Sequence, residues 1–149
     1  MEYKYYCLRW SVLLYCFLVI HQASADSIAP FASDGCSWFP DGLPELRTLW
    51  LDCCIAHDYA YWKGGKQDER MEADKQLKSC VSSLGQPAVG RLMEFGVRIG
   101  GTPVLPTSFR WGYGWPYPRD YQALTEEELG QVKRQSEGRY PNYSGQQME

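Results

Sequence analysis

The chain of 149 residues lacks several features that mark common functional classes. Its 15 Lys and Arg are fewer than its 18 Asp and Glu and are not clustered, which argues against nucleic acid as a partner. The same charge balance disfavours electrostatic capture by anionic lipid, so any membrane contact would be mainly apolar. No internal repeat and no alternating strand pattern is visible, and we therefore expect a mainly α protein.

A long hydrophobic span is also missing. The apolar run from Trp10 to Ile20 is shorter than the about 20 residues that a bilayer-spanning helix needs. Lys4 and Arg9 precede it and Ala23-Ser24-Ala25 follows it, a pattern typical of a cleavable secretory signal over residues 1–25. An uncleaved signal anchor is the alternative. Cleavage would leave residues 26–149 as a single secreted domain, with a loose polar tail after about residue 136.

Four helices are expected from apolar periodicity and end signals. The first is predicted from Pro44 to Lys63. Proline suits a helix start, because a first-turn residue has no intrahelical partner for its N–H, and the glycine after Lys63 ends the helix. Its predicted buried stripe is Leu46, Leu49, Trp50, Cys53, His57 and Tyr61. The others are predicted over about 68–84, from 87 to 100, and from a capping box at Thr125 to about residue 135.

The second helix contains an anomaly. Its predicted inward residues are Met71, Asp74, Leu77, Val81 and Leu84, so a carboxylate lies among apolar side chains. The third helix is predicted to bury Val89, Leu92, Met93 and Phe95. The short link between the first two helices favours an antiparallel hairpin.

Four cysteines remain after the predicted signal, which favours two disulfides in an exported chain. Cys53 and Cys54 are too close to bond each other, because adjacent Cα atoms lie about 3.8 Å apart. We prefer Cys36–Cys54 and Cys53–Cys80 over the swapped pairing. These two bonds would bring Asp74 beside His57 and the loop 34–37 beside Asp58, whereas the swapped pairing would assemble neither site.

These two sites suggest hydrolytic chemistry. A histidine oriented by a buried carboxylate can remove a proton from water, and carboxylate and carbonyl oxygens suit calcium. Zinc binding by Cys53, Cys54, His57 and Asp58 is disfavoured, since neighbouring cysteines diverge and secretion favours their oxidation. Taken singly, a His–Asp pair is more often a structural hydrogen bond, and an Asp in a Gly-rich loop is more often a turn former.

The motif Cys53-Cys54-Ile55-Ala56-His57-Asp58, followed by Tyr61, resembles the signature of the secreted phospholipase A2 superfamily. Asp34-Gly35-Cys36-Ser37 is similar to the calcium loop of its small microbial and fungal members, and the resemblance covers residues 34–81. It implies calcium-dependent cleavage of the sn-2 ester of glycerophospholipids, with His57 as base, Asp74 as its partner and Tyr61 supporting Asp74. The metal ligands that it implies are Asp58, Asp34, Gly35 and Ser37.

The expected fold is therefore mainly α, with an antiparallel, disulfide-linked helix pair of phospholipase A2 type, an additional C-terminal helix and an extended aromatic segment. We expect a monomer that acts at phospholipid membranes or micelles, with Trp38 and Phe39 placed to touch lipid. A non-catalytic lipid- or protein-binding module on the same scaffold is the alternative, because residues 86–149 match nothing in that family. A structural or toxin-like role has no positive support in the sequence.

Five aromatic residues alternate with other residues in the C-terminal part, and they are Phe109, Trp111, Tyr113, Trp115 and Tyr117. An extended backbone would put all five rings on one face, either settled into lipid or packed across the helices. We favour packing, because five exposed rings would promote aggregation. Asn142-Tyr143-Ser144 matches a glycosylation sequon.

Overall fold

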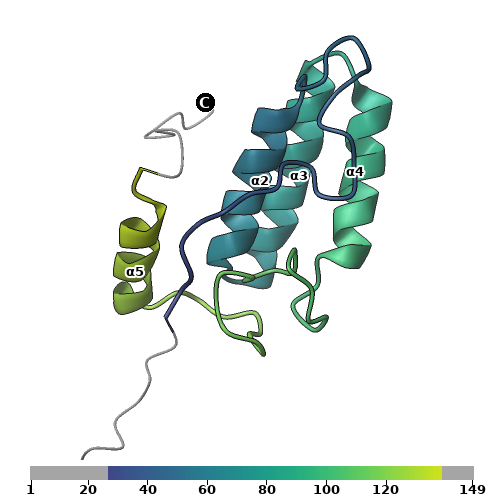
Figure 1. Cartoon of the computed structure of the whole chain (residues 1–149). Coiled ribbons are helices and arrows are strands. Elements are labelled where there is room, and N and C mark those ends of the chain that lie inside the picture. Colours follow the sequence, from purple (N-terminus) through teal and green to yellow (C-terminus); the bar gives the residue numbers. More distant parts are fainter. Residues whose placement is uncertain (1–26, 139–149) are drawn as a thin grey trace, which may run out of the picture.

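The structure is a computed structural model that describes residues 27–138 (Figure 1). The predicted signal, the end of the polar tail and the sequon at Asn142 lie outside these residues. Within them the chain forms four α-helices and no strand: α2 (Leu51–Lys63), α3 (Gln67–Ser83), α4 (Pro87–Gly100) and α5 (Glu126–Ser136). The expected mainly α class is confirmed for this part of the chain. None of these helices has the length and apolar character that crossing a bilayer requires.

The first predicted helix was placed seven residues too early. Residues 44–50 form turns instead, and α2 begins at Leu51. The backbone N–H of Trp50 donates to the carbonyl of Asp41 (3.0 Å), and its indole donates to the carbonyl of Pro40 (2.6 Å). Leu43 and Leu46 exchange two further backbone bonds. This segment therefore satisfies its polar groups by folding back on itself, which the local preference of Pro44 for a first turn did not reveal.

The other three helices lie within one or two residues of their predicted bounds. Pro87 stands in the first turn of α4, where the missing N–H costs nothing. At the start of α5, the Thr125 hydroxyl accepts from the backbone of Glu128, and the Glu128 carboxylate accepts from the backbone of Thr125. This is the expected capping box.

Helices α2, α3 and α4 lie side by side, and consecutive members run in opposite directions (Figure 1). Cys53 of α2 is bonded to Cys80 of α3, while His57 contacts Asp74, so one helix ascends as the other descends. Between α3 and α4, Lys78 pairs with Glu94 and Asp74 with Arg98 in the same reversed order. The antiparallel pair α2–α3 is thus disulfide-linked, as expected.

A glycine permits the closest approach of α3 and α4. A Cβ on Gly90 would stand 2.7 Å from the carbonyl oxygen of Lys78 and 2.9 Å from the hydroxyl of Ser82. Both contacts are shorter than packed atoms allow, so any side chain here would push the helices apart. The close packing sets the distance from α4 to the buried carboxylate of α3.

The core is divided into three clusters of buried side chains. One lies between the helices around Trp50, Leu77 and Met93, and another surrounds Tyr61, Ala73 and Trp111. A third joins the N-terminal segment to α5 through Ile28, Phe31, Trp62, Trp115 and Val132. In Figure 1, α5 lies apart from α3 and α4, on the other side of α2.

Four residues that were predicted to be buried are exposed: Leu46, Leu84, Leu92 and Phe95. Leu46 lies in the turns before α2, so the stripe that included it begins later. Leu84 follows the last residue of α3. Leu92 and Phe95 lie on α4, which packs on α3 through Gly90 and Met93 and presents the opposite face outward.

Candidate active site

Helix α2 carries three of the predicted site residues. His57 and Tyr61 are four residues apart, hence on one helix face, and their ring centroids are 4.2 Å apart. Asp58 is rotated by about 100° from His57 and faces the N-terminal loop. The phase of a single helix therefore separates a histidine side from a carboxylate side.

Asp74 on α3 lies opposite His57, and its carboxylate is completely buried. Its Oδ1 accepts a hydrogen bond from the Tyr61 hydroxyl (2.7 Å) and lies 3.1 Å from Nε2 of His57. An ionised carboxylate only accepts, so Nε2 of His57 carries the hydrogen in this pair. Nδ1 is then the nitrogen left to accept a proton.

The Tyr61 hydroxyl is itself held from behind. Nε of the buried Arg70 donates to it (3.0 Å), and burial together with the negative charge of Asp74 raises the pKa of Tyr61. Tyr61 therefore stays a donor to Asp74. The remaining Arg70 nitrogens bond the hydroxyl of Tyr121 and the carbonyls of Val97 and Arg98, each at 2.8 Å. Both carbonyls lie near the end of α4, and that of Val97 also accepts from the backbone N–H of Gly101.

Sequence reasoning missed Arg98, which contacts the other oxygen of Asp74. Its Nε lies 2.8 Å from Oδ2, within ion-pair distance. The N–H does not point at the oxygen, so neither atom has a hydrogen-bond partner among the described residues, and the contact is one of charge. A signal was available: Asp74 and Arg98 stand at equal sequence distances on either side of Gln86, in the turn between α3 and α4. An antiparallel hairpin about that turn brings them together.

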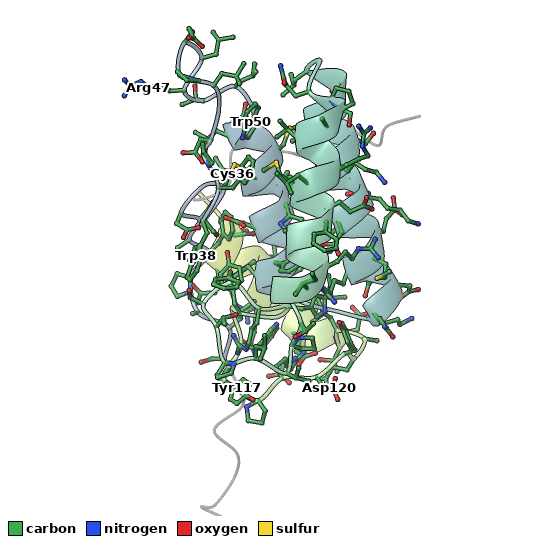
Figure 2. All side chains as sticks on the ribbon, turned by 90° about the vertical axis from the view of Figure 1, so that its right-hand side faces the viewer. Cys36, Trp38, Arg47, Trp50, Tyr117 and Asp120 are labelled. Carbon is green, nitrogen blue, oxygen red and sulfur yellow. A yellow bond between two sulfur atoms is a disulfide. The ribbon has the colours of Figure 1, made fainter. Side chains whose placement is uncertain are left out.

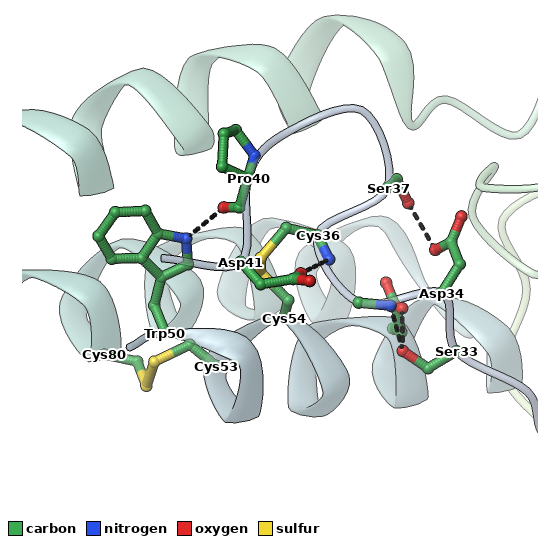
Figure 3. Close-up of a disulfide and its surroundings, with 12 residues drawn as sticks. Ser33, Asp34, Cys36, Ser37, Pro40, Asp41, Trp50, Cys53, Cys54 and Cys80 are labelled. Carbon is green, nitrogen blue, oxygen red and sulfur yellow. Dashed lines mark hydrogen bonds between the residues drawn. A yellow bond between two sulfur atoms is a disulfide. The ribbon is translucent and has the colours of Figure 1, made fainter. Parts of the chain in front are cut away.

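The N-terminal loop is tied to α2 by Cys36–Cys54, and α3 by Cys53–Cys80 (Figure 3). These are the pairs that we preferred from helix geometry. Gly35 and Ser37 both have positive φ, of 77° and 54°, which turns the chain sharply around Cys36. The backbone N–H of Cys36 donates to Oδ1 of Asp41 (2.8 Å), closing the loop on itself.

The predicted ligand residues gather on this loop beside Asp58. The Ser33 hydroxyl donates to Oδ2 of Asp58 (2.6 Å), and the Ser37 hydroxyl donates to Oδ1 of Asp34 (2.9 Å) (Figure 3). The pKa of Asp58 is raised to about 7, mainly by burial; the Ser33 hydrogen bond acts to lower it, and the charges of Asp34 and Asp41 act to raise it. At neutral pH Asp58 is therefore only partly ionised, and a cation beside it would favour the ionised form.

The residues around Asp58 can be compared with the ligands that a calcium ion takes. Within residues 27–138, no three His, Cys, Asp or Glu side chains converge closely enough to hold a metal by themselves. A cation here would need backbone carbonyls of the loop as well as carboxylates, and such mixed oxygen sets are what calcium takes. The donors Asp58 and Asp34, with Gly35 and Ser37 in the same turn, fit that chemistry.

A pocket of about 500 Å³ lies beside His57 and beside the loop that faces Asp58. His57, Asp58 and Tyr61 line one part of it. Its other walls are mostly apolar and come from the loop, α3, α4 and the C-terminal segment: Trp38, Phe39, Leu77, Leu92, Met93, Val97 and Phe109. A small polar group in a largely apolar cavity suits a ligand with a hydrocarbon part and a single reactive polar bond.

Two of the residues that line the pocket, Trp38 and Leu92, are also exposed to solvent. Trp38 is 93% exposed and meets Phe109 edge-on, and Figure 2 shows it on the loop beside α2. Leu92, Phe95 and Ile99 form an exposed row along α4, and Val104 and Leu105 follow it in the chain. Such a concentration is typical of surfaces that contact another apolar surface.

The aromatic segment does not adopt the extended form that alternation suggested. Residues 109–117 form turns, so the five rings do not share one face. Trp111 and Trp115 are buried, and their indoles donate to the carbonyls of Gly65 and Lys63 at the end of α2. Tyr117 is exposed (Figure 2). The backbone of Gly112 also donates to the carbonyl of Tyr61 (2.6 Å), so the segment covers the end of α2 below the site.

Comparison with protein-family models, with curated proteins and with solved structures found no match to this chain.

Proposed function

We propose that the protein is a secreted, calcium-dependent hydrolase of phospholipase A2 type, which cleaves the sn-2 acyl ester of glycerophospholipids. The observation that carries the proposal is His57 held by the buried Asp74 at the wall of an apolar pocket, one residue from Asp58. The disulfide-linked α2–α3 pair would then be the helix pair of that superfamily. The combination supports water-based hydrolysis, since no serine or cysteine nucleophile is needed.

In the proposed reaction, His57 acts through Nδ1 while Nε2 remains bonded to Asp74. As the oxygen of a water molecule bonds to the acyl carbon, one of its protons passes to Nδ1. The tetrahedral intermediate then breaks the bond to the glycerol oxygen, which takes the proton from Nδ1 and leaves as the alcohol. Asp74 stabilises the transient imidazolium and keeps the ring oriented, with Tyr61 supporting that carboxylate.

Asp58 would hold calcium together with Asp34 and the backbone of Gly35 and Ser37. A bound calcium ion supplies positive charge that stabilises the oxyanion of the intermediate. Burial and neighbouring carboxylates raise the pKa of Asp58, and a bound cation would favour its ionised form. The disulfide Cys36–Cys54 holds the first turn of the loop on α2, which keeps the loop ligands at a constant separation from Asp58.

The lipid would approach the pocket from the side of its exposed lining residues, Trp38 and Leu92. Trp38 on the loop and the row Leu92, Phe95 and Ile99 on α4 would settle into the apolar edge of a membrane or micelle. With 18 acidic against 15 basic residues in the chain, this contact depends on apolar area more than on charge. We propose action as a secreted monomer.

The test is fatty acid release from phosphatidylcholine vesicles with calcium or with a chelator. His57→Gln should lower the rate by at least about 1000-fold, because the base is removed. Asp58→Asn should abolish the response to calcium, and Asp52→Asn, an exposed carboxylate on the same helix, should leave the rate unchanged. Equal release by wild type and His57→Gln at equal thermal stability would refute the proposal.

A non-catalytic lipid-binding module is the second candidate. It is favoured by the absence, within residues 27–138, of three metal-ligating side chains that converge, and by the Ser33 hydroxyl already bonded to Asp58. Sedimentation with vesicles and fatty acid release, measured on one sample, separate the two. Binding without turnover at any calcium concentration would select the module.

A further inference from the structure

The neighbours of the buried Asp74 carboxylate must balance its negative charge. A carboxylate removed from water is costly unless an opposite charge and hydrogen bonds replace its hydration. The groups around the Asp74 carboxylate are His57 and Tyr61 from α2, Arg70 from its own helix, and Arg98 from α4. Arg70 reaches Tyr61 rather than the carboxylate, whereas Arg98 contacts it at 2.8 Å.

The two oxygens of Asp74 have different partners. Oδ1 takes both hydrogen bonds, from His57 and Tyr61, and Oδ2 faces Nε of Arg98. A carboxylate with nothing at its second oxygen could turn partway about its Cβ–Cγ bond and carry Oδ1 away from the imidazole. A positive charge beside Oδ2 therefore keeps Oδ1 toward the imidazole.

Contacts of its other two nitrogens hold the guanidinium of Arg98 in place. Its NH2 nitrogen donates to the carbonyl of Met71 (3.0 Å) and lies 3.5 Å from Glu94, which is paired with Lys78 at 2.7 Å. Its NH1 nitrogen lies 2.8 Å from the sulfur of Met71. These contacts join α3 and α4 around the guanidinium, so its charge is delivered at a constant place.

We infer that Arg98 is a positioning residue, which keeps the carboxylate of Asp74 turned toward His57. The inference rests on the proposed function for its kinetic consequence only. The role assigned to Arg98 is electrostatic, because its Nε–H does not point at Oδ2. A lysine at the same position should preserve most of the effect, and an uncharged residue of similar length should not.

The experiment compares wild type, Arg98→Met, Arg98→Lys and the matched control Arg91→Met, an exposed arginine on the same helix. The first measurement is the tautomer of the His57 ring by ¹⁵N NMR at a pH where the ring is neutral. In the protein without residues 1–25, His57 is the single histidine. If those residues are retained, His21→Asn leaves His57 as the single histidine. The second is the kcat and KM of vesicle hydrolysis.

Wild type, Arg91→Met and Arg98→Lys should show one tautomer, with the proton on Nε2, and Arg98→Met should show a mixture. In Arg98→Met, kcat should fall by about 10- to 100-fold with KM within about twofold, the size of effect that loss of an outer partner has at metal-bound histidines. Arg98→Lys should recover most of the loss.

A single Nε2–H tautomer in folded Arg98→Met would overturn the inference. If Arg98→Met does not fold, Arg98→Lys provides the test. A mixture of tautomers in Arg98→Lys would also reject the role of charge. The tautomer measurement needs no turnover, so a wild-type protein without hydrolytic activity would defeat the proposed function and leave the inference standing.

Discussion

Around Asp74, each side chain depends on its neighbours. The carboxylate is wholly buried, and it is tolerable there because His57, Tyr61 and Arg98 surround it. Tyr61 is both donor and acceptor, since it bonds Asp74 and receives Nε of Arg70. Removing one member of such a network leaves the others unsatisfied in a medium where water cannot replace the lost partner.

Tyr61→Phe tests this dependence. We expect a loss of about 1–3 kcal/mol in the free energy of unfolding, because Arg70 and Asp74 each lose a buried hydrogen bond. The hydrolytic rate should fall as well, since Asp74 orients His57 less firmly. Chemical denaturation measures the first effect. Tyr117→Phe is the control, because its hydroxyl bonds the carbonyl of Val104 in an exposed position (3.0 Å) and should matter by less than about 0.5 kcal/mol; equal losses in the two variants would contradict the network.

The helices form a layer in which α3 is the central member. It is linked to α2 by a disulfide and by the His57–Asp74 contact, and to α4 by ion pairs. Both sides of the proposed catalytic pair thus depend on how closely neighbouring helices approach. On the α4 side, Gly90 sets this distance, because nothing larger than hydrogen fits between it and the backbone of Lys78.

Gly90→Ala should therefore lower the free energy of unfolding by about 1–3 kcal/mol through overpacking. Gly96→Ala, in the same helix, should raise it by up to about 1 kcal/mol, since a Cβ there meets no atom within 4 Å and alanine favours a helix. Thermal or urea unfolding of both variants provides the comparison. Opposite signs are the expected result, and two stabilised proteins would show that α3 and α4 do not pack through Gly90.

At the scale of the whole molecule, the two disulfides attach a loop and a helix to neighbouring faces of α2. Cys36–Cys54 closes 18 residues and holds the loop of Asp34, while Cys53–Cys80 closes 27 residues and holds the helix of Asp74. Loops of this size restrict the unfolded chain by about 3 kcal/mol per bond. Stability is expected to depend on both bonds about equally, and chemistry on each in a different way.

Paired Cys→Ala replacements separate these roles. Loss of Cys36–Cys54 should raise the calcium concentration for half-maximal activity by at least about 10-fold, because the ligand loop is no longer held. Loss of Cys53–Cys80 should lower kcat with a smaller change in calcium response. Each should cost about 3 kcal/mol in denaturant unfolding. Identical calcium titrations for the two variants would contradict the division into two sites.

Local patterns determined much of this protein. Apolar periodicity, capping residues and glycine ends located three helices, and the spacing of Cys53, Cys54, His57 and Asp58 on one helix indicated which sulfur bonds would assemble a site. The first helix start, the exposure of Leu92 and Phe95, and the turns around Trp111 could not be read locally. In each case long-range hydrogen bonds or packing outweighed a weak local preference: Trp50 to Asp41, Gly90 against α3, and the Trp111 indole to Gly65.

The candidate site divides in the same way. Helix phase alone places His57 and Asp58 on neighbouring faces, because successive residues are separated by about 100°. The contact of Asp74 with Arg98, the support of Tyr61 by Arg70 and the pocket exist only in the folded chain. The physical reason is that charge pairing and cavity shape depend on distances between segments far apart in sequence, which the packing of α2, α3 and α4 decides.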